Sequence, residues 1–274
     1  MACALGAKVM ERNSKGWREK VLWLAGILLA FAAWKGLALW LGELKLPAPE
    51  IILRAMVVDL VQSPILELQG GGSNGIWPHL LYTFERTLLG SVIGLLLGVL
   101  VGLLIGYSRW LRLLLEAPIE TMRTVPPLAA IPFFLMWFGP TQTAQLSMMV
   151  FYCFFMLLIN TVSAIANVNP IYLNYANTLG ASKRQTYRTV VFPAIIPELV
   201  GGIRVAIGVS WGIQIVTELM GAQQGMGQVF SMAMPMQALD LIIVGVLWIT
   251  ILAATTDLLF VWAARTVTRW VPVE

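Results

Sequence analysis

Charged side chains within apolar segments are the first candidates for chemistry in this sequence. Arg123, Arg204, Glu218 and Asp257 lie in or beside apolar runs, where an unpaired charge costs about 2.5–3.5 kcal/mol. Each is therefore expected to pair with an opposite charge or to face a cavity. Arg123 with Glu120, and Arg204 with a carboxylate on another helix, are the structural pairings. Alternatively, either guanidinium could bind the oxygens of an anion such as sulfonate or nitrate in a bidentate way.

A second polar group lies near the outer end of the fifth expected apolar helix. Gln214 and Glu218 are four residues apart and so share one helix face, with Trp211 on the adjacent side. We predict that this face is a gate or part of a pathway lining. The full set of candidates for that role is Arg123, Arg204, Trp211, Gln214 and Glu218.

Metal chemistry and intramembrane catalysis are disfavoured. The chain has one histidine, His79, and two cysteines, Cys3 and Cys153, whereas a metal site needs several ligands at defined spacing. An intramembrane enzyme would need a Ser/His, paired Asp or metal constellation within the bilayer. We therefore expect no catalytic residue, no metal site and no cofactor bound by this chain.

The composition indicates an all-α polytopic membrane protein. Of 274 residues, 58% are hydrophobic and 12% charged, and the mean hydropathy is +0.80. A span needs about 20 apolar residues. The six expected spans are Val21–Leu41, Leu88–Tyr107, Pro126–Phe138, Leu146–Ala166, Ile195–Met220 and Leu241–Ala264. The third contains three prolines, so we expect a kinked helix that starts near Leu114.

The distribution of basic residues predicts the orientation. With the amino terminus inside, twelve of the eighteen Lys and Arg residues fall on the inner side, so the positive-inside rule places both termini in the cytoplasm. Those twelve are Lys8, Arg12, Lys15, Arg18, Lys20, Arg109, Arg112, Lys183, Arg184, Arg188, Arg265 and Arg269.

These spans define the expected organisation of the chain. It comprises a cytoplasmic segment 1–20, a first transmembrane helix 21–41, an outer segment 42–83, a membrane core 84–264 with a cytoplasmic loop at 167–193, and a cytoplasmic tail 265–274. Within the outer segment, Glu50 to Val61 is expected to form a short interfacial helix.

Glycines follow a strict spacing of four in the second span. They are Gly90, Gly94, Gly98, Gly102 and Gly106. Small residues at this spacing let another helix backbone approach closely. Intrachain packing is the structural interpretation, and a surface along which helices slide during transport is the functional alternative.

The loop 167–193 carries local signals for a bent pair of helices. Asn169 can cap a helix that has Pro170 at its first position, and Gly180 can end that helix in the left-handed conformation. Ser182 and Gln185 form a capping-box pattern that opens a second helix. The sequence therefore predicts two helices that meet at a glycine corner.

Such a corner could bind a partner protein. The sequence lacks the G-x-x-x-x-G-K-[ST] loop that cradles phosphates, so we do not expect this chain to hydrolyse ATP. Tyr172, Leu173, Tyr175 and Leu179 could anchor the first helix in a partner's cleft. The alternative is a loop that lies on its own bundle.

The same residues carry a resemblance to a known family. The run from Asn174 to Pro193, with Ala176, Gly180, Ala181, Tyr187 and Val191 in register, resembles the EAA loop of binding-protein-dependent ABC importer permeases. That loop has the pattern EAAxxxGA, then an aromatic residue and Leu-Pro. Segments that agree with the nitrate/sulfonate/taurine branch, from about Pro47 to Trp262, are Leu46 to Glu50, His79 to Gly90, Arg123 to Ala129, Trp137 to Gly139, and Gly202 to Trp211 ahead of Glu218. Asn174 and Tyr175 replace the usual Glu-Ala, and Phe192 replaces the usual Leu.

The resemblance implies a type I ABC importer permease subunit in the inner membrane. Such a subunit pairs with a second copy, and each copy docks one of two ABC ATPase subunits that hold ATP and Mg²⁺. The pair receives solute from an external binding protein; membrane lipid surrounds it and no nucleic acid is involved. ATPase closure would then switch access by rigid-body motion. The residues implied in ATPase coupling are Asn174, Tyr175, Ala176, Gly180, Ala181, Lys183 and Arg184.

The function expected from the resemblance is ATP-driven import of a small anion. An aliphatic sulfonate or taurine ranks ahead of nitrate or bicarbonate. An ion-coupled secondary transporter or half-transporter is the alternative from another class; repeats and midplane carboxylates are common in such proteins, and we find neither in this sequence.

Overall fold

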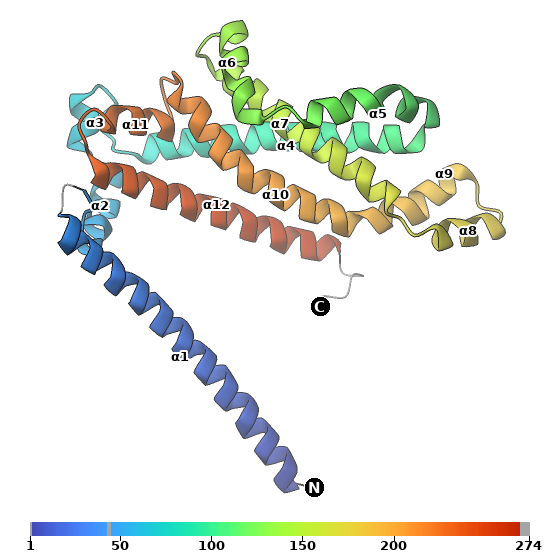
Figure 1. The fold of residues 1–274 in the computed structure, drawn as a ribbon, viewed down its shortest axis with the longest axis horizontal. Helices are drawn as coiled ribbons and strands as arrows, with labels where there is room; N and C mark the ends of the chain where they lie inside the picture. The colour runs from blue at the N-terminus through green and yellow to red at the C-terminus, as the bar shows by residue number, and fades with distance from the viewer. Residues whose placement is uncertain (1, 43–44, 269–274) are drawn as a thin grey trace.

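The computed structural model describes residues 2–42 and 45–268, and within these it leaves out the side chains of residues 2–19, 123 and 267. The described chain is helical, with short connections (Figure 1). The helices are α1 (Ala2–Leu41), α2 (Pro49–Val61), α3 (Pro64–Leu68), α4 (Trp77–Tyr107), α5 (Arg109–Arg123), α6 (Pro127–Phe138), α7 (Gln142–Ala166), α8 (Pro170–Thr178), α9 (Lys183–Thr186), a π-helical segment (Tyr187–Val191), α10 (Phe192–Leu219), α11 (Met226–Ala233) and α12 (Leu239–Val267).

Five helical stretches in the described chain are long and apolar enough to cross a membrane, whereas the sequence predicted six spans. The five are Lys20–Leu41, Trp77–Tyr107, Gln142–Ala166, Lys183–Leu219 and Leu239–Thr266. Several of these stretches begin or end outside the predicted spans. Their terminal turns contain polar residues, which the hydropathy criterion left out of the predicted spans although they are helical in the structure. The start of α4, with His79, Thr83 and Arg86, is an example.

The third expected span is wrong as a single kinked helix. Its apolar part is α6, which has 12 residues and is about 18 Å long, too short to cross a bilayer alone. A separate helix, α5, precedes it. The chain breaks between them because Pro126 and Pro127 lack the N–H groups that a continuous helix would use.

The two short helices nevertheless return the chain along the whole bundle. α4 ends at Tyr107, and α7 starts beside the beginning of α4, where Arg86 Nη2 donates a hydrogen bond to Gln142 Oε1 at 2.6 Å. The segment 108–141 therefore runs from one end of the bundle to the other.

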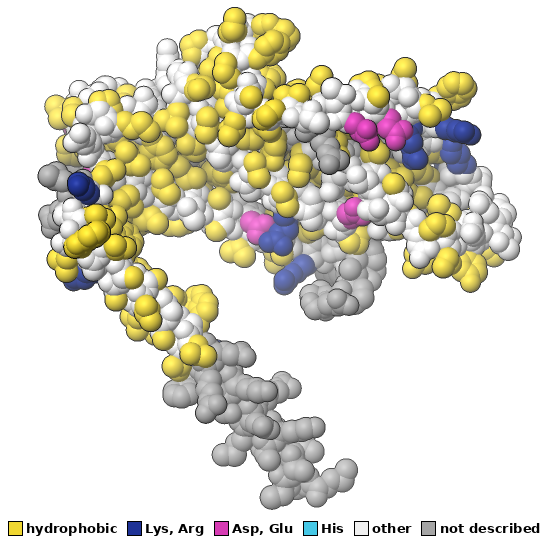
Figure 2. All heavy atoms as spheres, in the orientation of Figure 1, with side chains coloured by type: hydrophobic (Ala, Val, Ile, Leu, Met, Phe, Trp, Pro, Cys, Tyr) yellow, Lys and Arg dark blue, Asp and Glu magenta, His cyan; other side chains and the backbone are white. Residues whose placement is uncertain are grey.

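The bundle has two ends that differ in structure (Figure 1). At the first, the starts of α4 and α12 and the end of α10 meet α2, α3 and α11, and α7 starts beside the loop that follows α10; we call it the α11 end. At the other, the ends of α4, α7 and α12 and the start of α10 lie near α5, α8 and α9; we call it the α8 end. Hydrophobic side chains cover much of the bundle's length, and charged side chains gather in a few small groups (Figure 2).

Two main apolar cores hold these elements together. One joins α4, α7 and α10 through Leu95, Cys153 and Ile195. The other lies at the α11 end, where Ile52 of α2 packs with Met226 and Phe230 of α11. The expected short helix from Glu50 to Val61 is confirmed as α2, and its Ile52 is 1% exposed.

The glycines of α4 face α7. A Cβ atom built on Gly94 would lie 2.7 Å from the carbonyl oxygen of Val150, and one on Gly98 would lie 2.5 Å from that of Phe154. Gly90, Gly102 and Gly106 likewise meet Met149, Thr161 and Ile165. The two helices approach so closely that a side chain at these positions would collide with α7.

Helix α1 extends away from the bundle (Figure 1), and most of its described side chains are exposed. It contacts the rest of the chain near its carboxyl end. Trp34 Nε1 donates to the carbonyl oxygen of Pro47 at 3.2 Å, Ala38 is buried, and Lys35 forms an ion pair with Glu50 of α2. That ammonium lowers the pKa of Glu50 through the hydrogen bond it donates.

Candidate functional site

The corner at the α8 end has the predicted local structure. The Asn169 side chain accepts a hydrogen bond from the Ile171 N–H at 3.0 Å, and Pro170 occupies the first turn of α8. Gly180 follows α8 with φ of +75°, and a Cβ atom there would meet nothing within 4 Å. The backbone conformation, rather than crowding, therefore favours glycine at this position.

The second half of the corner is continuous with α10. Ser182 N donates to Gln185 Oε1 at 3.0 Å and Ser182 Oγ accepts from Gln185 N at 3.4 Å, so the predicted capping box is confirmed. The helix then continues through the π-helical segment into α10. Pro193 has no N–H, which removes one α-helical hydrogen bond where the wider turn occurs. A force on α9 would therefore act directly on α10.

The tip of the corner exposes apolar side chains. Tyr175 is 67% exposed and Leu179 86% exposed, and Tyr172 is exposed as well. Ala176 is buried and Leu173 packs against the α4–α7–α10 core. Large exposed apolar side chains on a polar loop favour partner contact over folding back onto the bundle.

The other residues implied in coupling surround this tip. Asn174, Gly180, Lys183 and Arg184 are exposed, and Ala181 is partly buried. The structure thus brings all of them to one corner, with Ala176 on the inner side of α8.

Two tyrosines outside the set of residues implied in coupling attach the corner to α4. Tyr187 Oη donates to the carbonyl oxygen of Leu103 at 2.7 Å, and its ring meets that of Tyr107 edge-on at 5.2 Å. Lys183 Nζ lies 4.7 Å from the centre of the Tyr107 ring, a cation–π geometry. The Tyr187–Leu103 hydrogen bond joins residues 84 positions apart, and no local pattern indicates contacts over such a separation.

At the α11 end, Glu218 is a buried acceptor. Its carboxylate receives hydrogen bonds from Thr83 Oγ1 at 3.0 Å, Gln214 Nε2 at 2.8 Å and Gly227 N at 2.9 Å. Glu218 is 1% exposed and Gln214 fully buried. The predicted polar face therefore lies inside the subunit, between α4, α10 and α11.

Side chains of α4 complete the attachment of α11. Thr83 Oγ1 accepts from Met226 N at 2.9 Å, and His79 Nδ1 accepts from Gly225 N at 3.2 Å. With the Glu218 contact, three successive N–H groups at the start of α11 are bound by α4 and α10. Sequence reasoning missed His79 and Thr83 in this role, although their four-residue spacing places them on one helix face.

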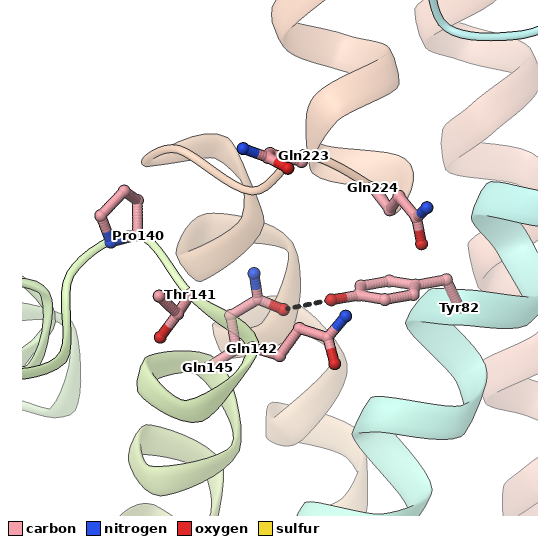
Figure 3. A pocket seen from close by; sticks show the side chains of 7 residues that line it. All are labelled: Tyr82, Pro140, Thr141, Gln142, Gln145, Gln223 and Gln224. Atoms are coloured by element: carbon pink, nitrogen blue, oxygen red, sulfur yellow. Dashed lines mark hydrogen bonds between the residues drawn. The ribbon is translucent and has the colours of Figure 1, made fainter.

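A polar cavity of about 280 Å³ lies beside this cluster. Its lining consists of uncharged residues from α4, the loop before α7, the first turn of α7 and the loop after α10: Tyr82, Pro140, Thr141, Gln142, Gln145, Gln223 and Gln224 (Figure 3). Tyr82 Oη donates a long hydrogen bond of 3.5 Å to Gln145 Oε1. The amide and hydroxyl groups can both donate and accept hydrogen bonds.

The α11 end also carries a half-buried carboxyl group outside the spans. Burial, together with the nearby charge of Asp240, raises the pKa of Asp59 in α2 to about 6. This group therefore changes charge close to neutral pH.

The remaining candidates are Arg204, Trp211 and Arg123. Arg204 pairs with Asp257 of α12 through two hydrogen bonds of 2.8 Å each, which confirms a carboxylate partner on another helix. Trp211 is 4% exposed, and its ring lies 6.3 Å from that of Phe84. The side chain of Arg123 lies outside the described residues, so its expected pairing with Glu120 stays a prediction. Within the described ranges, no group of three or more His, Cys, Asp or Glu could hold a metal ion.

Comparison with known proteins agrees with this architecture. Residues 94–271 match the family described as "Binding-protein-dependent transport system inner membrane component". The putative aliphatic sulfonates transport permease protein SsuC of Escherichia coli K12 is 33% identical over 85% of this chain and 84% of its own length. The taurine transport system permease protein TauC of the same organism is 27% identical over 84% and 82%.

The fold also resembles a solved structure. The crystal structure of an amino acid ABC transporter with histidines matches with a TM-score of 0.57 and 21% identity, over 70% of this chain and 92% of that chain. At this identity the likeness concerns the fold alone.

Proposed function

Because the chain belongs to the binding-protein-dependent transport system inner membrane component family, we propose that it carries a small organic anion of the aliphatic sulfonate and taurine class into the cell. As a permease of this family, it is a multi-pass inner-membrane protein, and a partner ATPase hydrolyses the ATP. The observation that carries the substrate class is the 33% identity to the sulfonate permease over 85% of the chain. Nitrate and bicarbonate rank behind it.

In the proposed assembly, two copies of this chain form the pathway. Each copy docks one ATPase subunit, which holds ATP and Mg²⁺, through the corner formed by α8 and α9, and a solute-binding protein delivers the anion outside. The exposed Tyr175 and Leu179 side chains support this docking. The helix from Lys183 to Leu219 would carry the movement of the corner to the α11 end, where α10 holds α11.

We further propose that the α8 end and both termini face the cytoplasm. The twelve basic residues of the expected inner side support this orientation. The path of α5 and α6 supports it too, because this pair adds a return passage to the five spans. An even number of passages brings both termini to one side.

The outer gate is proposed to lie at the α11 end. Gln214 and Glu218 would hold the gate closed through the contacts of α11, with Trp211 packed one turn away. Arg204 is paired with Asp257, so a solute contact there would require that pair to open. Arg123 is a second candidate for contact with the transported anion.

Reconstitution tests the substrate class. The tagged chain is purified from its native membranes with the co-purifying ATPase and placed in nanodiscs, and ATP hydrolysis is measured with candidate binding proteins. We expect at least about fivefold stimulation by a binding protein loaded with taurine or ethanesulfonate. Stimulation by nitrate or bicarbonate alone would reassign the solute. Uptake that persists without ATP on an ion gradient would instead indicate a secondary transporter.

The coupling role of the corner has its own test. Gly180→Trp should leave the protein in the membrane, because a side chain there meets no neighbour and the strain of the left-handed backbone is confined to the exposed corner. It should nevertheless reduce stimulated ATP hydrolysis about tenfold by distorting and blocking the docking surface. Gly180→Asn is the matched control, since Asn tolerates the left-handed conformation and is small. Stimulation that survives in the tryptophan variant would remove the corner from the mechanism.

A further inference from the structure

A second cavity lies at the α8 end, and of the residues implied in coupling only Lys183 lines it. It measures about 500 Å³ and lies between the end of α4, the start of α5, the end of α7 and the corner. One part of its lining is apolar, with Ile165, Val168 and Leu173, and another is polar, with Arg112, Asn177, Lys183 and Thr186.

The polar part holds donors that lack partners. Among the described residues, Arg112 Nε and Thr186 Oγ1 are both buried without a hydrogen-bond partner. The guanidinium makes one weak contact, from Nη2 to the carbonyl oxygen of Gly106 at 3.3 Å. Buried polar groups are normally satisfied, so two such atoms in one cavity indicate a missing acceptor.

The charge of the cavity is positive and not compensated nearby. Within the part of the chain that the structure describes, the two ion pairs are Lys35–Glu50 and Arg204–Asp257, so neither Arg112 nor Lys183 belongs to one. Glu116, one turn further along α5, is exposed. Two cations and an unpaired hydroxyl group are the donors that a phosphate or sulfonate group prefers.

The position of the cavity indicates which kind of molecule would carry the phosphate or sulfonate group. It opens where α4 and α7, two helices that can cross a membrane, come to an end. A free anion in water would gain nothing from the apolar lining of Ile165, Val168 and Leu173. A phospholipid would place its glycerol and upper acyl chains against these side chains and its phosphate beside Arg112.

We infer that this cavity binds the phosphate of an anionic phospholipid, with Arg112, Lys183 and Thr186 as donors. The bound headgroup would bridge α5 and α9, since Arg112 belongs to the first and Lys183 to the second. It would thereby fix the corner against the end of α4, in addition to the Tyr187 contact. The site depends on the membrane location of the chain and not on the identity of the transported anion.

The full-length protein in detergent allows a direct test by native mass spectrometry with added phosphatidylglycerol, phosphatidylcholine or inorganic phosphate. Arg112→Gln should weaken the tightest phosphatidylglycerol binding about tenfold. Arg109→Gln is the matched control, because Arg109 is an exposed base on the same helix that does not line the cavity, and it should change binding less than about twofold. Thr186→Val should weaken binding about threefold.

Several outcomes would overturn the inference. Equal losses in the Arg112 and Arg109 variants would indicate general attraction to basic residues. Equal binding of phosphatidylcholine would remove the need for an anionic headgroup, and displacement of the lipid by inorganic phosphate at equal concentration would identify a free oxyanion site. The headgroup comparison uses the unchanged protein, so it remains decisive if the Arg112 variant does not fold.

Discussion

Replacing Gly98 with leucine is expected to prevent α4 from packing against α7 and to leave little folded protein in the membrane. A Cβ atom at this position would lie 2.5 Å from the carbonyl oxygen of Phe154 and 3.0 Å from the Leu157 Cβ. The first of these atoms is backbone and cannot move aside without shifting α7. Overpacking alone costs about 1–3 kcal/mol, and separation of the helices would add the loss of the core they share.

Membrane abundance and thermal unfolding of the purified chain would measure this effect. We expect abundance to fall about tenfold. Gly208→Leu is the matched control, because a side chain at Gly208 in α10 meets nothing within 4 Å. A Gly98→Leu protein that accumulates and melts like the unchanged chain would contradict the close packing of α4 on α7.

The second large effect is expected at Glu218. In Glu218→Ala, the donors on Thr83, Gln214 and Gly227 would lose their shared acceptor while remaining buried. Each unsatisfied buried donor costs about 1–3 kcal/mol, so we expect a loss of about 3–5 kcal/mol after partial relaxation. The start of α11 should then separate from α4 and α10.

Hydrogen exchange at residues 225–227 would detect this separation locally, and thermal unfolding would report its total cost. Glu218→Gln should have an intermediate effect, because its oxygen still accepts but its NH₂ group faces other donors. Glu85→Ala, which removes an exposed carboxylate from α4, should change neither measurement. Unchanged exchange at α11 in the alanine variant would show that Glu218 does not hold it.

The corner illustrates how far local sequence determines structure. Asn169, Gly180 and the pair Ser182 and Gln185 each act over two or three neighbouring residues, and all three signals gave the correct geometry. Local sequence also explains why the helix is interrupted at Pro126 and Pro127, but it did not predict how complete the interruption is. A kink was expected, and the chain instead forms two helices.

The sequence by itself therefore determined the membrane class, most of the helices, the bent corner and the glycine face of α4, because hydropathy, capping and spacing are local properties. Only the tertiary structure decided which helix meets that glycine face, that Asp257 is the partner of Arg204, and that Glu218 binds α4 and α11. It alone also placed Arg112 and Lys183 on one cavity. Helices that are apolar on all sides do not indicate which face meets which neighbour, so contacts such as that of Thr83 with Glu218, 135 positions apart, arise only when the whole bundle is packed.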